Sequence, residues 1–148
     1  MKAKLEEVCE RDSSNLKQSD IIGMERDYPI YGASGYIGNV NFYHQKNSYV
    51  AVVKDGAGIG RTTLHPAKSS VIGTMQYLVP KDNVIPEYLY YVVSHMHLEK
   101  YFTGATIPHI YFKHSSSYKL INRKCHNYNI LSNNILKSTA KIEYFYQN

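Results

Sequence analysis

The spacing of hydrophobic and polar positions changes near residue 83, and the two parts of the chain predict different elements. Before that point, apolar residues come in short runs or alternate with polar ones, as in β-strands. After it, apolar residues recur at intervals of three and four, on one face of a helix: Ile85, Tyr88, Leu89, Val92, Val93 and Met96. The pattern predicts a β-rich part followed by one main helix over residues 84–101, with Pro86 in its first turn.

Within the β-rich part, turn residues separate the predicted strands. "YPIY" (28–31) and "YIGNVNFY" (36–43) predict strands on either side of the turn "GASG", with a bulge at Gly38. "SYVAVVKDG" (48–56) is almost continuously apolar, so we expect a central strand buried on both faces. "RTTLH" and "SVIGTMQYLVP" predict two further strands, the second with a glycine in its middle.

The remaining segments are less regular. Residues 4–9 fit a short strand or one helical turn, and the polar residues 10–27 predict a surface connection. "GATIPHIYFKHSS" predicts extended structure after the helix, with a turn at Pro108, and the Asn-rich residues 121–148 predict a marginal helix or a partly disordered tail. The fold expected is mixed α/β (α+β). It is one compact domain over residues 1–120, a twisted, mainly antiparallel sheet with one main helix near residues 84–101.

Charge adds a preference for anionic partners. The formal net charge of +5 is uneven, because residues 1–27 hold five Lys/Arg against seven Asp/Glu and residues 28–148 hold twelve against five. Residues 28–148 are therefore basic, and a basic surface attracts polyanions, of which nucleic acid is the first candidate. The 15 tyrosines, with no tryptophan, suit half-buried and binding surfaces, and a β-rich core also uses them.

Residues for catalysis or for a cofactor are few. His95 and His97 are two residues apart on the predicted helix, where a zinc pair needs a spacing of four, and no CxxC or HExxH occurs. "DGAGIG" (55–60) precedes a predicted strand where a dinucleotide-binding loop precedes a helix, so we interpret it as a β-turn with positive φ angles. We expect no cofactor, no metal and no enzymatic activity. A small enzyme using His44 or His65 with Asp55 is the alternative.

The compartment expected is the cytoplasm. Two cysteines, Cys9 and Cys125, make no disulfide framework, which favours a reducing environment. The N-terminal segment lacks the apolar core of a signal peptide, and no apolar run reaches the length of a membrane span.

Polar residues around the predicted turns are the candidate contacts to DNA. Lysine and arginine can reach guanine or a phosphate, glutamine can bridge adenine, and threonine can do either. For each residue the alternative is an ordinary exposed polar side chain. The candidate set, which also includes two residues of the predicted strand 36–43, is Tyr36, Asn39, Lys54, Arg61, Thr62, Thr63, Lys68, Thr74 and Gln76.

Four blocks of this chain together resemble a known family. "YPIYGASGYIG", "VVKDGAGIGR", "PKDNVIPEYLYYVV" and "GATIPHIYFK" occur in the order and spacing of a target recognition domain from the specificity subunit of type I restriction-modification enzymes. The resemblance covers Tyr28 to about Lys113. The positions that match the family pattern are Gly32, Gly35, Gly38, Asp55, Gly56, Gly60, Thr106, Pro108 and Phe112.

The resemblance implies a role in double-stranded DNA recognition. Such a domain reads half of a bipartite site, and the matching residues are mostly architectural. The specificity subunit docks methyltransferase (modification) subunits, which hold S-adenosylmethionine and methylate adenine, and restriction subunits join these. A homodimer or a second half-subunit could complete the assembly.

The chain departs from the family pattern after residue 113. One recognition domain is present where the family usually has two. "HSSSYKLINRKCHNYN" stands where a proline-rich turn, an EQ stretch and a heptad helix usually follow. The expected alternative is therefore a truncated protein-interaction or decoy module that docks a methyltransferase subunit without specific DNA binding.

Overall fold

A computed structural model describes residues 2–21, 27–82, 84–101, 103 and 119–121. The chain divides into a main unit, Lys4–Leu120, and a second unit formed by Met1–Ala3 and Ile121–Asn148. β1 (Lys2–Lys4) and β9 (Lys119–Ile121) pair as a two-stranded sheet. The extended structure predicted after residue 104 and the tail predicted from residue 122 lie outside the described residues.

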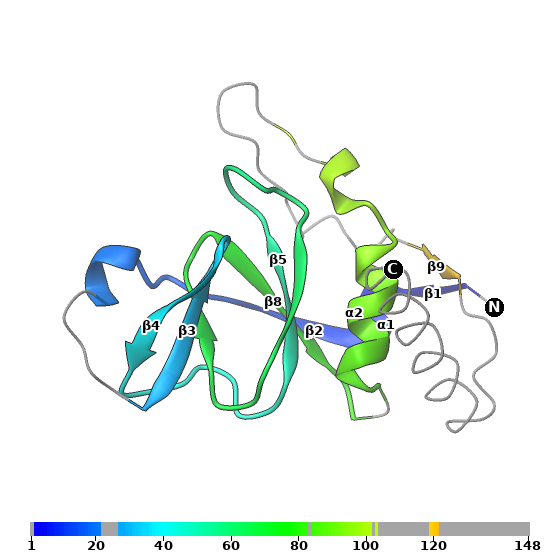
Figure 1. The fold of residues 1–148 in the computed structure, drawn as a ribbon. Helices are drawn as coiled ribbons and strands as arrows, with labels where there is room; N and C mark the ends of the chain where they lie inside the picture. Colours follow the sequence, from blue (N-terminus) through cyan, green and yellow to red (C-terminus); the bar gives the residue numbers. More distant parts are fainter. Residues whose placement is uncertain (1, 22–26, 83, 102, 104–118, 122–148) are drawn as a thin grey trace, which may run out of the picture. The chain divides into compact units, whose positions relative to one another are not determined.

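A four-stranded antiparallel sheet forms the centre of the main unit (Figure 1). Its order is β2 (Cys9–Ser13), β8 (Met75–Pro80), β5 (Tyr49–Val53) and β6 (Thr62–His65). All five residues of β5 are buried, which confirms the central strand expected from its continuous apolar run. Val50 and Val52 face one apolar cluster, whereas Tyr49, Ala51 and Val53 face another.

Helices cover one face of this sheet. α1 (Leu5–Val8), α2 (Pro86–Ser94) and the 3₁₀ helix η2 (Leu98–Tyr101) contribute Leu5, Leu89, Val93 and Leu98 to a cluster with Val50, Val52 and Leu78. The main helix is confirmed, but the range 84–101 was too long. It ends at Ser94, because His97 adopts a left-handed φ of 52° before η2 begins. Met96 continues the helical spacing and is half-buried against the same cluster.

A three-stranded sheet packs on the other side, in the order β4 (Gly35–Val40), β3 (Tyr28–Gly32) and β7 (Ser70–Val71), and η1 (Gln18–Ile21) lies beside it (Figure 1). β3 pairs antiparallel with β4 and parallel with β7. The register shifts from Ile30↔Gly38 to Tyr31↔Tyr36, so Ile37 is the extra residue of a bulge. The bulge therefore lies next to Gly38, where the sequence predicted it.

Two predictions about strands were wrong. "SVIGTMQYLVP" is not one strand, because residues 72–74 turn the chain from β7 in one sheet to β8 in the other. The Gly73 amide donates to the Leu16 carbonyl at 2.8 Å, which fixes that turn. Residues 10–27 are not all connection, since Cys9–Ser13 form β2. This edge strand is polar because four of its five residues are exposed.

The expected fold class is confirmed: the described residues of the main unit form two mainly antiparallel sheets, where one was expected, and one main helix. Among the described residues, no helix is both long and apolar enough to span a membrane.

Candidate nucleic-acid interface

Three turns meet at one end of the two sheets, and we call them the three-turn end. They are the β3–β4 turn (residues 33–34), the β5–β6 turn (residues 54–61) and the β7–β8 turn (residues 72–74). The Thr74 carbonyl accepts hydrogen bonds from the amides of Lys54 and Asp55 at 3.0 and 3.3 Å. The Ile72 amide donates to the Tyr31 carbonyl at 3.0 Å. Backbone hydrogen bonds therefore hold the turns in fixed positions.

Arg61 joins two of these turns through its side chain. Its Nη1 donates to the Ala33 carbonyl at 2.9 Å, and its guanidinium lies over Gly58. The side chain is exposed. A guanidinium carries five N–H donors, so a single bond to Ala33 leaves donors for an external phosphate or base. The residue both braces the β3–β4 turn and presents a positive charge at the end of the sheets.

Tyr36 is the most exposed aromatic side chain of this end, at 61%. Its hydroxyl donates to Asn39 Oδ1 at 3.2 Å, and its ring meets Tyr31 edge-on with centroids 6.1 Å apart. These contacts hold the ring against β3 and β4 while it stays open to solvent. An exposed, oriented ring can contact a base or a sugar.

Of the nine predicted contacts, the structure brings five together at the three-turn end: Tyr36, Lys54, Arg61, Thr62 and Thr74. Asn39 is linked to them through Tyr36. Thr63, one residue into β6, is half-buried, and its Oγ1 lies 2.7 Å from Nε2 of His65.

The other two predicted contacts lie elsewhere. Lys68 is exposed in the β6–β7 turn, at the opposite end of β6, and has a left-handed φ of 56°. Gln76 is 7% exposed, and its side-chain amide donates to the Asp12 carbonyl, which fastens β8 to the edge strand β2. These residues were grouped with the other candidates because they are close in sequence. In the fold, the strands place their side chains away from the three turns.

His65 is a buried residue at the end of β6 away from the three turns, and the sequence marked it only as an alternative catalytic group. It is 5% exposed and stacks on Tyr49 at a centroid distance of 5.3 Å, and the Tyr31 ring lies tilted against it at 4.4 Å. Burial lowers the pKa of His65 from 6.5 to about 4. Asp55 lies in the β5–β6 turn at the far end of β6, so the structure does not bring the two together.

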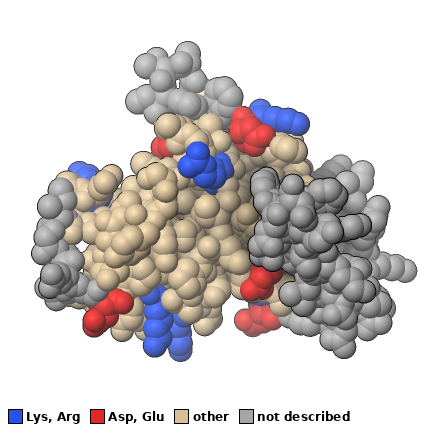
Figure 2. Space-filling view, viewed as in Figure 1, with Lys and Arg blue, Asp and Glu red and all other residues tan. Residues whose placement is uncertain are grey.

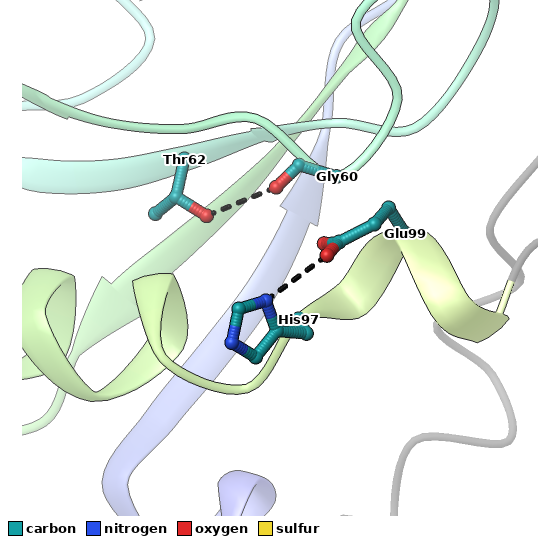
Figure 3. A network of polar contacts seen from close by, with 4 residues as sticks. All are labelled: Gly60, Thr62, His97 and Glu99. Carbon is teal, nitrogen blue, oxygen red and sulfur yellow. Dashed lines mark hydrogen bonds and ion pairs between the residues drawn. The ribbon is translucent and has the colours of Figure 1, made fainter.

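The β5–β6 turn also touches the segment that follows α2 (Figure 3). Gly60 has a φ of +83°, and a Cβ placed on it would lie 2.6 Å from the Glu99 backbone nitrogen and 2.9 Å from the Glu99 Cα. Thr62 Oγ1 donates to the Gly60 carbonyl at 3.3 Å. Within the segment that follows α2, His97 Nδ1 lies 3.0 Å from Glu99 Oε1. A hydrogen bond from its own backbone amide, with the adjacent His97, lowers the pKa of Glu99.

Charge is sparse around these elements. Residues 28–81 carry five Lys/Arg (Lys46, Lys54, Arg61, Lys68 and Lys81) and a single acid, Asp55. In Figure 2, most of the described surface in view is neither basic nor acidic. Within the part of the chain that the structure describes, no three His, Cys, Asp or Glu side chains are grouped so as to hold a metal ion.

The chain resembles a known family in sequence and a solved structure in fold. A family model described as "Type I restriction modification DNA specificity domain" matches residues 1–122. A crystal structure of the S subunit of a type I restriction-modification system from M. genitalium matches with a TM-score of 0.67 and 14% sequence identity. The match covers 81% of this chain and 33% of that subunit, so the chain spans about a third of its length. No curated protein matches. At 14% identity the structural likeness shows the fold alone. The family-model match over residues 1–122 confirms the expected family.

Proposed function

Because this chain belongs to the type I restriction modification DNA specificity domain family, we propose that its three-turn end binds double-stranded DNA and reads half of a bipartite site. In this proposal the chain supplies recognition only, and partner subunits that dock on it carry out adenine methylation and cleavage. Residues 1–120 are the recognition domain, and no cofactor is bound by it. The observation that carries the proposal is the convergence of Tyr36, Lys54, Arg61, Thr62 and Thr74 at one end of the sheets.

The chemistry of these side chains supports the proposal. Arg61 and Lys54 offer positive charge and N–H donors that suit phosphate oxygens and the acceptor edge of guanine. Thr62, Thr74 and Tyr36 offer hydroxyl groups that can donate or accept at a base edge. Their backbone is fixed by hydrogen bonds between the turns, so little conformational entropy is lost when they meet a partner.

A selection experiment tests this function. The full chain is incubated with a randomised DNA duplex library at moderate salt, and the retained duplexes are sequenced. We expect a short enriched motif, and binding that weakens as salt rises. The absence of any motif and of any salt-sensitive binding by folded protein would contradict the proposal.

Point variants locate the interface on the molecule. Lys54→Ala should lower the slope of log affinity against log salt by about one, because one phosphate contact is lost. Lys46→Ala is the matched control, since Lys46 is an exposed lysine away from the three turns. Equal slopes for the two variants would place the DNA elsewhere on the protein.

A second candidate function is protein docking without specific DNA binding. The observation that favours it is the exposure of Tyr90, Tyr91 and Tyr101, at 38%, 49% and 50%, along α2 and η2. Exposed tyrosines are enriched in protein interfaces. Co-purification with a type I modification subunit in the absence of DNA tests this role, and we expect Tyr91→Ala to weaken it. Retention of that subunit together with no enriched DNA motif would favour docking over recognition.

A further inference from the structure

The contact between Gly60 and Glu99 lies outside the set of DNA-facing side chains but adjoins it. Gly60 directly precedes Arg61 and Thr62, and its amide donates to the Val53 carbonyl at 2.8 Å. The β5–β6 turn is therefore tied to the end of β5 on one side. On its other side it rests on the backbone of η2, the short helix after α2.

The fit at this contact is tight. A Cβ on Gly60 would lie 2.6, 2.8 and 2.9 Å from the N, Cβ and Cα atoms of Glu99. Ordinary contact begins at 3.4 Å, so a methyl group there would push the two segments apart by about 0.8 Å. Two of the three atoms it would meet are backbone atoms, which cannot move aside by a change of rotamer.

The segment on the Glu99 side is itself held in place. Leu98 is 1% exposed and packs in the core cluster with Leu89 and Val93 of α2. The Lys100 amide donates to the His97 carbonyl at 3.0 Å, and His97 Nδ1 contacts Glu99 Oε1. Figure 3 shows Glu99 facing the turn at Gly60. A displacement at this contact is therefore not absorbed by η2 alone and moves the turn as well.

We propose that η2 positions the β5–β6 turn through the Gly60–Glu99 contact and thereby sets where Arg61 and Thr62 meet DNA. Gly60 and Glu99 act as positioning residues for DNA recognition, and this inference rests on the proposed function. Neither Gly60 nor the Glu99 backbone is assigned a direct contact to DNA. Their contact determines how the β5–β6 turn packs against η2.

Gly56 supplies a matched control for Gly60. It lies in the same turn with a nearly identical φ of +79°, but nothing lies within 4 Å of a Cβ built on it. Gly60→Ala and Gly56→Ala therefore impose the same backbone strain, and only Gly60→Ala adds the collision with Glu99. A difference between the two variants that appears at Glu99, which is distant in sequence from both substitutions, reports the contact.

The first measurement is made without DNA. Amide chemical shifts of the ¹⁵N-labelled full chain are compared among the wild type, G60A and G56A. We expect the Glu99 amide to shift more in G60A than in G56A, because Glu99 is close in sequence to neither substitution and meets only the Cβ at residue 60. Equal shifts in the two variants would overturn the inference and leave the proposed function intact.

The second measurement is the duplex selection described above, at a temperature where all variants are folded. We expect G56A to enrich the wild-type motif with an affinity within about threefold, and G60A to bind at least tenfold more weakly or to enrich a changed motif. An unchanged motif and affinity in G60A would overturn the inference. No motif with wild type would overturn the proposed function instead, and with it the DNA part of this inference.

If G60A does not fold, the double variant G60A/E99G takes its place. It removes one of the three atoms in the collision, the Cβ of residue 99, and gives η2 a more adaptable backbone, so that the N and Cα of residue 99 can shift. We expect it to fold and to recover part of the wild-type binding. A double variant no better folded than G60A would overturn the assignment of the defect to this contact.

Discussion

The buried imidazole of His65 predicts a loss of stability in mild acid. The ring lies between Tyr31 and Tyr49, and its Nε2 contacts the Thr63 hydroxyl. Burial lowers its pKa from 6.5 to about 4 in the folded protein, because a charged ring would lose its hydration among these aromatic side chains. In the unfolded chain the ring titrates near pH 6.5, so between pH 6.5 and 4 the unfolded state binds more protons.

The sign and size of the change in folding stability follow from this difference in pKa between the folded and unfolded states. Stability is full above pH 6.5 and falls as the pH decreases toward 4, by about 3 kcal/mol in all at 1.36 kcal/mol per pKa unit. By pH 5 the loss is about 2 kcal/mol. This is a substantial share of the stability of an ordinary domain.

Urea unfolding followed by circular dichroism between pH 8 and pH 5 measures the effect. His65→Gln is the matched variant, because its amide can still meet the Thr63 hydroxyl and does not titrate. Exposed carboxylates titrate alike in both proteins, so the difference between the two curves isolates His65. Parallel stability curves for wild type and His65→Gln over this range would refute the argument.

Three further predictions concern stability and are tested by the same unfolding assay. Gly60→Ala should destabilise the protein by about 1–3 kcal/mol more than Gly56→Ala, because only Gly60 meets the backbone of Glu99; equal losses would contradict this. Lys68→Gly should raise stability by about 0.5 kcal/mol, because Lys68 holds a φ of 56°, whereas Lys46→Gly should not raise it. Gln76→Ala should cost about 1–3 kcal/mol through the unsatisfied Asp12 carbonyl, and Gln45→Ala less, since its bond to Asp12 Oδ2 is exposed; a larger loss for Gln45 would reverse this reasoning.

The sequence predicted elements whose local pattern matches their burial. β5 was found because both of its faces are covered, which leaves a run of apolar residues and no alternation. α2 was found because one of its faces packs on the sheet. The ends of the elements were harder to predict from the sequence. The break between β7 and β8 depends on a hydrogen bond from Gly73 to Leu16, 57 residues away, which no local pattern records.

The candidate site was predictable in part for the same reason. Glycines mark the turns, and the structure brings together five of the polar and aromatic residues predicted beside them: Tyr36, Lys54, Arg61, Thr62 and Thr74. Gln76 is a polar residue like these, but its side-chain amide donates a hydrogen bond to the Asp12 carbonyl of β2. The bond from Arg61 to Ala33 and the contact of Gly60 with Glu99 join segments that lie 28 and 39 residues apart. Only the folded chain reveals that these segments support one another.

The low charge around the three turns bears on how such a surface could select a DNA sequence. Residues 28–81 carry five basic side chains, two of them at the three-turn end, so few phosphates can be neutralised there. Phosphate contacts add affinity without discrimination, whereas hydrogen bonds to base edges discriminate only when the donors are held in place. The turns are held from three directions: by Arg61 on Ala33, by the Thr74 carbonyl and by η2 against Gly60. In the proposed function, rigid placement of a few side chains therefore contributes more to selectivity than charge does, and variants that loosen the turns should alter the motif before they abolish binding.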